Sequence, residues 1–163
     1  MEYLMQAAVI GGGATALLDL WTLARQRVTG TPVPDYGAVG RWLAYMPRGQ
    51  FRHRAIAATP PVAGERVVGW IAHYVIGIAF AALLLAMTGV QWLQHPTPGP
   101  ALAVGVATVA APFLLMQPGM GAGFFASRTP RPGAARIRSL VTHAVFGLGL
   151  YAAGWLTRFL HQW

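Results

Sequence analysis

The chain of 163 residues contains no cysteine, no lysine and only four acidic residues. The absence of cysteine excludes disulfides, thiolate metal ligands and cysteine nucleophiles. Charged residues make up 10% of the chain, against about 25% in soluble proteins. Hydrophobic residues make up 55%, which is more apolar surface than one soluble domain of this length could bury. The composition therefore predicts a membrane protein.

Basic residues outnumber acidic residues by twelve to four. The net charge is +8, and all twelve basic residues are arginine. Such a balance can indicate nucleic-acid binding. The arginines, however, gather in the connections between apolar runs, where the preference of basic residues for the cytoplasmic side of a membrane explains them more simply. We therefore expect a lipid bilayer, and no nucleic acid, as a partner.

Four apolar runs are long enough to span a bilayer, which takes about 20 residues of helix. They cover about residues 3–23, 67–93, 100–125 and 137–160. The start of the chain lacks the basic region of a signal peptide, so we expect the first run to be retained as a helix. The sequence predicts an all-α membrane protein, in which residues 1–163 form a single domain with four transmembrane helices.

The connections between these runs differ in charge, and this difference predicts the topology. The first connection, residues 24–66, contains seven arginines, and the third contains four around residues 128–138. The second, residues 94–99, contains none. Arginine-rich connections stay in the cytoplasm. We therefore expect a bacterial inner-membrane protein with both termini in the periplasm.

A short amphipathic helix is predicted inside the long cytoplasmic connection. Asp35 can cap the start of this helix, and Pro47 can end it. The apolar residues between them follow helical spacing. Two interpretations stay open: a segment lying on the anionic inner leaflet, or a solvated basic loop. The residues predicted to lie at the membrane surface are Arg41, Trp42, Arg48, Arg52 and Arg54.

Runs 67–93 and 137–160 share a pattern in which a histidine follows an arginine by seven residues and is flanked four residues away by small residues. The matching triplets are Gly69, His73 and Gly77 in one run, and Ser139, His143 and Gly147 in the other. Spacing of four places each triplet on one helix face, and small residues let helices approach closely. The pattern predicts two helical hairpins related as parallel repeats.

Polar groups inside the apolar runs are few and are costly in lipid unless they have partners. Asp19 lies roughly 9 Å along its helix from Arg25, and each repeat histidine lies about 10 Å from its arginine. This matched depth predicts a cluster of Asp19, His73 and His143, which Gln117 could extend. Three roles stay open: a packing lock, a proton or cation relay, and a metal or haem site with His73 and His143 as ligands.

The glycines after Gln117 form no phosphate-binding motif, because no strand precedes them and no Lys-Ser/Thr pair follows. We expect Pro112 and Pro118 to interrupt the third helix, with a break or kink at Pro118 and with Gly119 and Gly123 in close helix packing. Ser-His-Asp, paired-carboxylate and HExxH patterns do not occur either, so the sequence gives little support to hydrolytic chemistry and favours a role other than that of an enzyme.

Several motifs together resemble an uncharacterised family of short bacterial inner-membrane proteins, known only as a domain of unknown function. They are Pro34–Gly37, Gly40–Trp42, Met46–Gly49, His73–Tyr74 and Met116–Gly121, and the most specific stretch runs from Gln117 to Pro132. The resemblance covers nearly the whole chain and implies a four-helix membrane protein. It implies no activity and no catalytic residues.

For function, the polar cluster favours a small-solute or proton-linked transport protein. Four helices leave little room for a pathway inside one copy, so we expect a homo-oligomer or a place in a larger membrane complex. Two alternatives stay open: a non-catalytic accessory or assembly subunit, and a redox protein that holds a metal or haem through its histidines.

Overall fold

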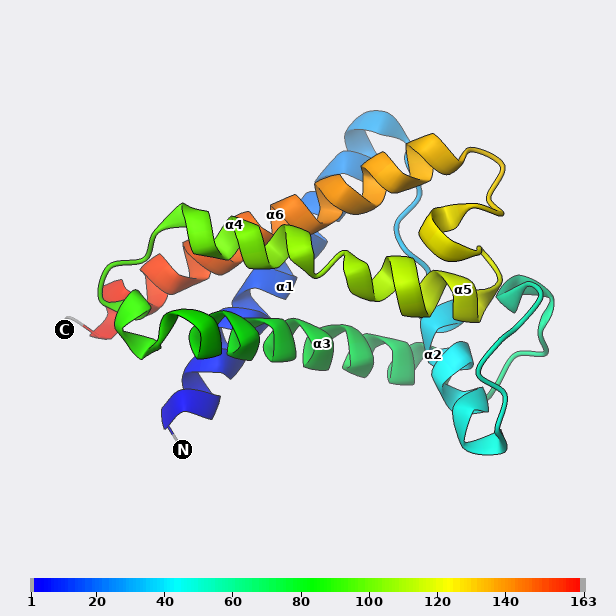
Figure 1. Ribbon diagram of the computed structural model, residues 1–163, viewed down its shortest axis with the longest axis horizontal. Helices are drawn as coiled ribbons and strands as arrows, with labels where there is room; N and C mark the ends of the chain where they lie inside the picture. The colour runs from blue at the N-terminus through cyan, green and yellow to red at the C-terminus, as the bar shows by residue number, and fades with distance from the viewer. Residues whose placement is uncertain (1, 162–163) are drawn as a thin grey trace. The chain divides into compact units, whose positions relative to one another are not determined.

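The computed structural model describes residues 2–161, and this part of the chain is helical, with no strand (Figure 1). Four helical stretches are long and apolar enough to cross a membrane. They are α1 (Glu2–Thr29), α3 (Glu65–Thr88), the stretch Pro98–Met120, and α6 (Pro132–His161) as far as Leu160. The predicted all-α architecture with four helices of membrane-spanning length is confirmed.

Left-handed glycines set several helix ends and shift them from the predicted positions. Helix α1 continues past residue 23 to Thr29, where Gly30 has φ 68° and its amide caps the Gln26 carbonyl. Helix α3 stops at Thr88 rather than near residue 93, because Gly89 has φ 76°. The short 3₁₀ turn η3 (Val90–Leu93) follows.

The third stretch is interrupted, as expected, at Pro112, whereas Pro118 lies within a short α-helix. The stretch consists of α4 (Pro98–Ala107), the π-helical turn η4 (Pro112–Met116) and α5 (Gln117–Met120). Pro112 opens the π-helical turn, because its ring nitrogen has no hydrogen to continue the α-helical ladder. The stretch ends at Met120, short of the predicted residue 125, because Gly121 has φ 94°.

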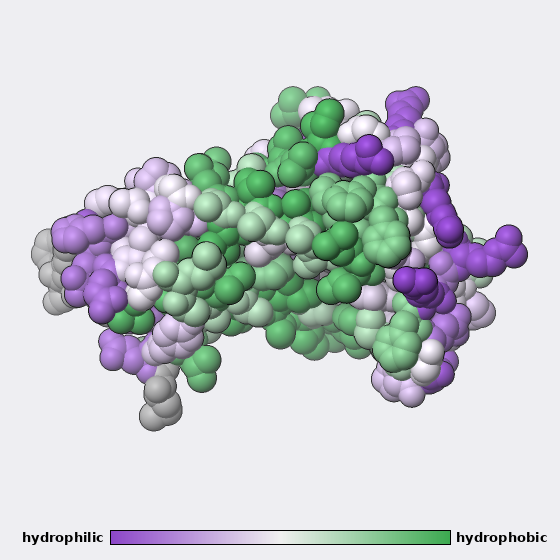
Figure 2. Space-filling view, in the orientation of Figure 1, coloured by the Kyte–Doolittle hydropathy of each residue, from purple (hydrophilic) through white to green (hydrophobic). Residues whose placement is uncertain are grey.

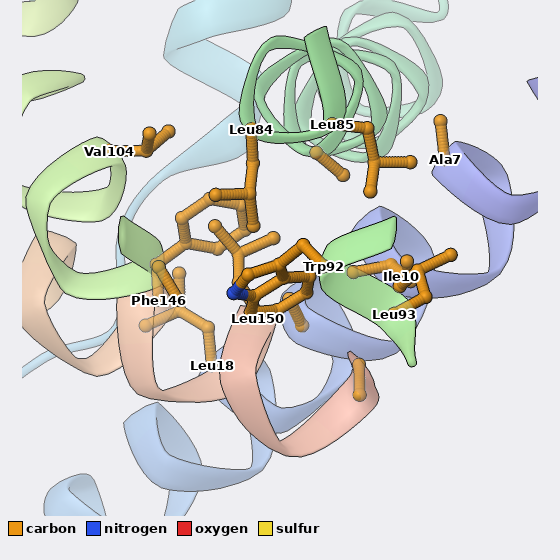
Figure 3. Close-up of a cluster of buried hydrophobic side chains, with 14 residues drawn as sticks. Ala7, Ile10, Leu18, Leu84, Leu85, Trp92, Leu93, Val104, Phe146 and Leu150 are labelled. Carbon is orange, nitrogen blue, oxygen red and sulfur yellow. The ribbon is translucent and has the colours of Figure 1, made fainter. Parts of the chain in front are cut away.

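The chain divides into two compact units. Unit 1 comprises the described parts of residues 1–33, 74–108 and 141–163, and unit 2 comprises residues 34–73 and 109–140. Unit 1 is built around a core of buried aliphatic and aromatic side chains from α1, α3, η3, α4 and α6 (Figure 3). Ile10, Leu84 and Leu150 are fully buried there, and Phe146 meets Phe80 edge to face.

Unit 2 carries the short helix α2 (Tyr36–Tyr45), the 3₁₀ turns η1 (Met46–Arg48), η2 (Ile56–Ala58) and η5 (Phe124–Ala126), and the start of α3 and of α6. The Asp35 side chain accepts a hydrogen bond from the Ala38 amide at 3.2 Å, which fixes the start of α2 as predicted. Pro47 lies within η1, where the α-helix gives way to a 3₁₀ turn.

The long helices keep most of their surface uncovered. Within the apolar 18-residue window of each of the four spans, no more than 39% is buried in the structure. On the face shown in Figure 2, hydrophobic side chains cover these helices and hydrophilic side chains gather at the connections. A surface of this kind is typical of helices that could span a membrane.

Candidate functional site

Asp19 of α1 receives a hydrogen bond from a phenol inside unit 1. The Tyr74 hydroxyl of α3 donates to Asp19 Oδ2 at 3.1 Å, and both side chains are partly buried. Because a carboxylate accepts and a phenol donates, the bond fixes the orientation of the Asp19 side chain. Tyr74 was named as part of a family motif but was given no place in the predicted polar cluster. The signal available was a tyrosine within a long apolar helix, where its hydroxyl needs a partner.

His143 of α6 is held by α4 within the same unit. Its Nδ1 lies 3.0 Å from the Thr108 hydroxyl and 3.2 Å from the Gly105 carbonyl oxygen. The Thr108 hydroxyl donates its own hydrogen to the Gly105 carbonyl at 2.6 Å. Both neighbours of Nδ1 therefore act as acceptors, so Nδ1 carries the proton of the neutral ring. Nε2 is then the nitrogen that would take up a further proton or bind a ligand.

His73 has its described partner in unit 2. Its Nε2 lies 3.0 Å from the Tyr36 hydroxyl at the start of α2, and the two rings stack with centroids 4.2 Å apart. Trp70, one helical turn earlier, packs against both rings. This aromatic group fastens α2 to the first turns of α3.

Gln117 lies at the start of α5 in unit 2. Its Nε2 is 3.5 Å from the Ser139 hydroxyl of α6, and its buried Oε1 has no hydrogen-bond partner among residues 2–161. Ser139 is the small residue that lies four positions before His143 in the repeat, and here it faces α5.

Each of the four predicted polar residues thus has a different described partner, and two of the four residues lie in each unit. Asp19 and His143 lie in unit 1, and His73 and Gln117 lie in unit 2. Their grouping into one cluster stays a prediction. Within residues 2–161 no set of three or more histidine, aspartate or glutamate side chains is placed to hold a metal ion.

The repeat glycines lie at close backbone contacts. A β-carbon on Gly77 would meet the Thr15 hydroxyl of α1, and one on Gly147 would lie 2.9 Å from the Ala101 carbonyl oxygen of α4. Gly69 lies directly against the Tyr36 carbonyl oxygen at the start of α2. Each of these small residues therefore faces another helix of its own unit.

The two glycines beyond the repeat lie in unit 2 and differ in kind. Gly119 of α5 faces the Trp42 indole, which a β-carbon would approach to 2.5 Å. Gly123 has φ 75° and lies in a turn next to Ser127 and Arg128, so its role is conformational.

Arg41 connects α2 to α3 and to the loop between them. Its Nε and Nη2 donate to the two carboxylate oxygens of Glu65 at 2.8 and 2.7 Å, which is a bidentate pair. Its Nη1 donates to the carbonyl oxygens of Ile56 and Thr59 at 3.1 and 3.0 Å. The hydrogen bond to Glu65 raises the pKa of the Arg41 guanidinium above its ordinary value. Arg41 is therefore a structural anchor.

The remaining residues predicted at the membrane surface have varied settings. The Trp42 indole donates to the Phe51 carbonyl oxygen at 2.9 Å, and the Arg48 guanidinium lies 5.1 Å from the centre of the Tyr45 ring. Arg52 and Arg54 are exposed. Contact of this segment with a leaflet stays a prediction.

Comparison with known proteins identifies a family and little else. Residues 8–157 match the sequence profile of a family described as "Protein of unknown function (DUF2938)". No curated protein and no solved structure matches the chain.

Proposed function

The chain belongs to the DUF2938 family of proteins of unknown function, and we propose that it is a proton-linked transport protein of the bacterial inner membrane. Asp19 is the proposed proton-carrying group, and Tyr74 is the residue that positions it. The observation that carries the proposal is the hydrogen bond from the Tyr74 hydroxyl to Asp19 Oδ2 within an apolar helical unit.

A carboxylate in a membrane-spanning helix is costly and is usually found at a proton or ion pathway. Asp19 is flanked by apolar residues, and the next charged residue along α1 is Arg25. The side chain is partly buried rather than fully enclosed. It can therefore exchange a proton with its surroundings while the Tyr74 hydroxyl holds it in place.

The proposed threading follows from the arginines. The connections that contain residues 24–66 and 128–138 are cytoplasmic, and the arginine-free connection 94–99 is periplasmic. Both termini are then periplasmic. Since four helices enclose little space, the pathway is proposed to form between copies of a homo-oligomer.

Proton movement into liposomes tests the proposal directly. Purified protein is reconstituted with a pH-sensitive dye inside, and a potassium diffusion potential drives protons inward. We expect uptake by the unchanged protein and none by Asp19→Asn, because the amide has the same shape but carries no titratable proton. Tyr74→Phe should lower the rate of uptake, because the carboxylate loses the donor that positions it.

Asp35→Asn is the matched control, because asparagine caps a helix as well as aspartate does. It makes the same chemical change at the cap of α2 and should leave uptake unchanged. Circular dichroism and gel filtration establish that each variant folds. Absence of uptake by the unchanged protein, or full uptake by folded Asp19→Asn, would overturn the proposal.

A non-catalytic accessory subunit could dock onto a larger complex through helix faces that carry glycines. In unit 1 the faces that carry Gly77 and Gly147 are occupied by α1 and α4. An accessory role would therefore have to use other surfaces of the helices, and co-purification from native membranes is its test.

A further inference from the structure

A cavity of about 480 Å³ lies in the loop of unit 2 between α2 and α3. Its size falls within the range of about 300–1,000 Å³ that is typical of small-molecule sites. The walls include Arg52, Arg54, His53, Gln50 and Thr59, together with two alanines. All five of these polar side chains can donate a hydrogen bond, and no carboxylate lines the cavity.

In the sequence, the two arginines directly precede and follow a buried histidine. Arg52 and Arg54 are exposed, whereas the His53 side chain is only 7% exposed. Neither arginine forms a salt bridge within residues 2–161. Two guanidinium groups two residues apart on one rim therefore present positive charge that the described structure does not neutralise.

The loop that carries these arginines is held firmly by the rest of unit 2. The His53 amide donates to the Gly119 carbonyl oxygen at 2.8 Å, and Gly121 lies directly against the Arg54 carbonyl oxygen. Arg41 adds its two hydrogen bonds to the carbonyl oxygens of Ile56 and Thr59. A loop fixed in this way presents its side chains in a set arrangement, which lowers the entropy cost of binding.

His53 adds a second, independent sign of a ligand site. Its Nδ1 lies 3.0 Å from the Thr59 hydroxyl and 3.3 Å from the Gln50 amide nitrogen. Its Nε2 is buried and has no hydrogen-bond partner among residues 2–161. A buried polar atom without a partner is unfavourable. The Thr59 hydroxyl donates to the Ala55 carbonyl oxygen at 3.2 Å and therefore accepts from Nδ1, so a hydroxyl donor of a ligand that reaches Nε2 would relieve it.

We propose that this cavity binds a phosphate group through Arg52 and Arg54, with His53 Nε2 as an additional contact for a protonated oxygen of the group. A guanidinium presents paired N–H groups in a fork that matches the oxygens of a phosphate. Phosphate is also the acceptor chemistry that a wall of donors without carboxylates fits best. The group can belong to an anionic phospholipid head or to a free phosphate compound, and the site is independent of the proposed role of Asp19.

Two binding assays distinguish these sources. In the first, native mass spectrometry counts phosphatidylglycerol retained by the protein against a phosphatidylcholine background. In the second, calorimetry measures the affinity for inorganic phosphate and for glycerol phosphate. We expect Arg52→Ala and Arg54→Ala each to weaken binding about tenfold or more, as loss of a charge-assisted hydrogen bond does. Because both side chains are exposed, thermal stability should not change.

Arg48→Ala is the matched control, because it removes the same charge from the same connection but lies outside the cavity lining. Binding that depends on Arg52 and Arg54 but not on Arg48 supports the site, and the assay that detects it names the source. If Arg48→Ala weakens binding as much as Arg52→Ala, the loop is a general basic surface and the proposal is overturned. Absence of binding in both assays overturns it as well.

Discussion

Gly105 of α4 and Gly147 of α6 bring two helix backbones into direct contact. A β-carbon on Gly105 would lie 2.5 Å from the Gly147 Cα. Main-chain atoms cannot turn aside as the end of a flexible side chain can. The contact therefore requires that both positions lack a side chain, which is the mode by which small residues stabilise helix pairs in membranes.

Substitution of Gly105 by alanine should separate these helices and destabilise unit 1. We expect a loss of about 1–3 kcal/mol, as overpacking typically costs, seen as a lower melting temperature in detergent. Gly99→Ala on the same helix is the control, because nothing lies within 4 Å of its β-carbon position. Equal melting temperatures for the two variants would mean that α4 and α6 do not pack as described.

A second prediction uses two neighbouring glycines of α1. A β-carbon on Gly11 would lie 2.5 Å from the Ile78 Cα of α3, whereas one on Gly12 meets nothing within 4 Å. Gly11→Ala should therefore destabilise the protein by about 1–3 kcal/mol. Gly12→Ala should be neutral or slightly stabilising, because alanine favours the helix. Chemical denaturation in detergent compares them, and the reverse order would contradict the α1–α3 contact.

The sequence predicted one side of these contacts and not the other. The repeat around the histidines drew attention to Gly77 and Gly147. Their partners Gly11 and Gly105 lie in helices that match each other poorly, so no repeat marked them. A local signal did exist, because each partner glycine precedes a threonine, Thr15 or Thr108, that bonds its carbonyl.

The helices themselves were predictable because hydropathy and length alone decide whether a segment can span a bilayer. The partners of the polar side chains were not, because they depend on how each helix is rotated about its axis. The hydroxyls of Tyr74, Thr108 and Tyr36 all contact predicted residues, and none was predicted. Helix ends differed where a glycine adopts positive φ, as Gly89 and Gly121 do.

The bidentate pair of Arg41 with Glu65 should control the order of the loop between α2 and α3. Arg41→Lys keeps the charge but cannot donate to both carboxylate oxygens and two carbonyl oxygens at once. We expect faster amide hydrogen exchange over residues 50–62, measured by mass spectrometry. Arg48→Lys, which changes an arginine that rests on Tyr45, should leave that exchange unchanged. Similar exchange in both variants would show that Arg41 does not anchor the loop.

The proposed threading predicts the accessibility of single cysteines, and the chain has no native cysteine to interfere. In intact spheroplasts an impermeant maleimide should label Gln94→Cys, because the arginine-free connection is periplasmic. Arg54→Cys and Arg131→Cys should react only after permeabilisation. Labelling of residue 131 from outside, with residue 94 protected, would invert the topology and with it the expected position of both termini.

The Thr108 hydroxyl is expected to set both the tautomer of His143 and part of the α4–α6 contact. Thr108→Val keeps the shape of the side chain but removes the acceptor that lies 3.0 Å from His143 Nδ1. Thr108→Ser keeps that acceptor and removes only a methyl group. We expect valine to cost about 1 kcal/mol, the scale of interhelical hydrogen bonds in membranes, and serine to cost less than valine.

Nitrogen NMR of labelled histidine supplies a readout that packing alone would not change. In the unchanged protein and in Thr108→Ser, the proton should reside on Nδ1, because both neighbours of that nitrogen accept. In Thr108→Val only the Gly105 carbonyl remains, at 3.2 Å, so the signal should shift toward a mixture of tautomers. If serine and valine give the same spectrum and the same stability, the hydroxyl plays no part. The contact would then rest on the glycine pair alone.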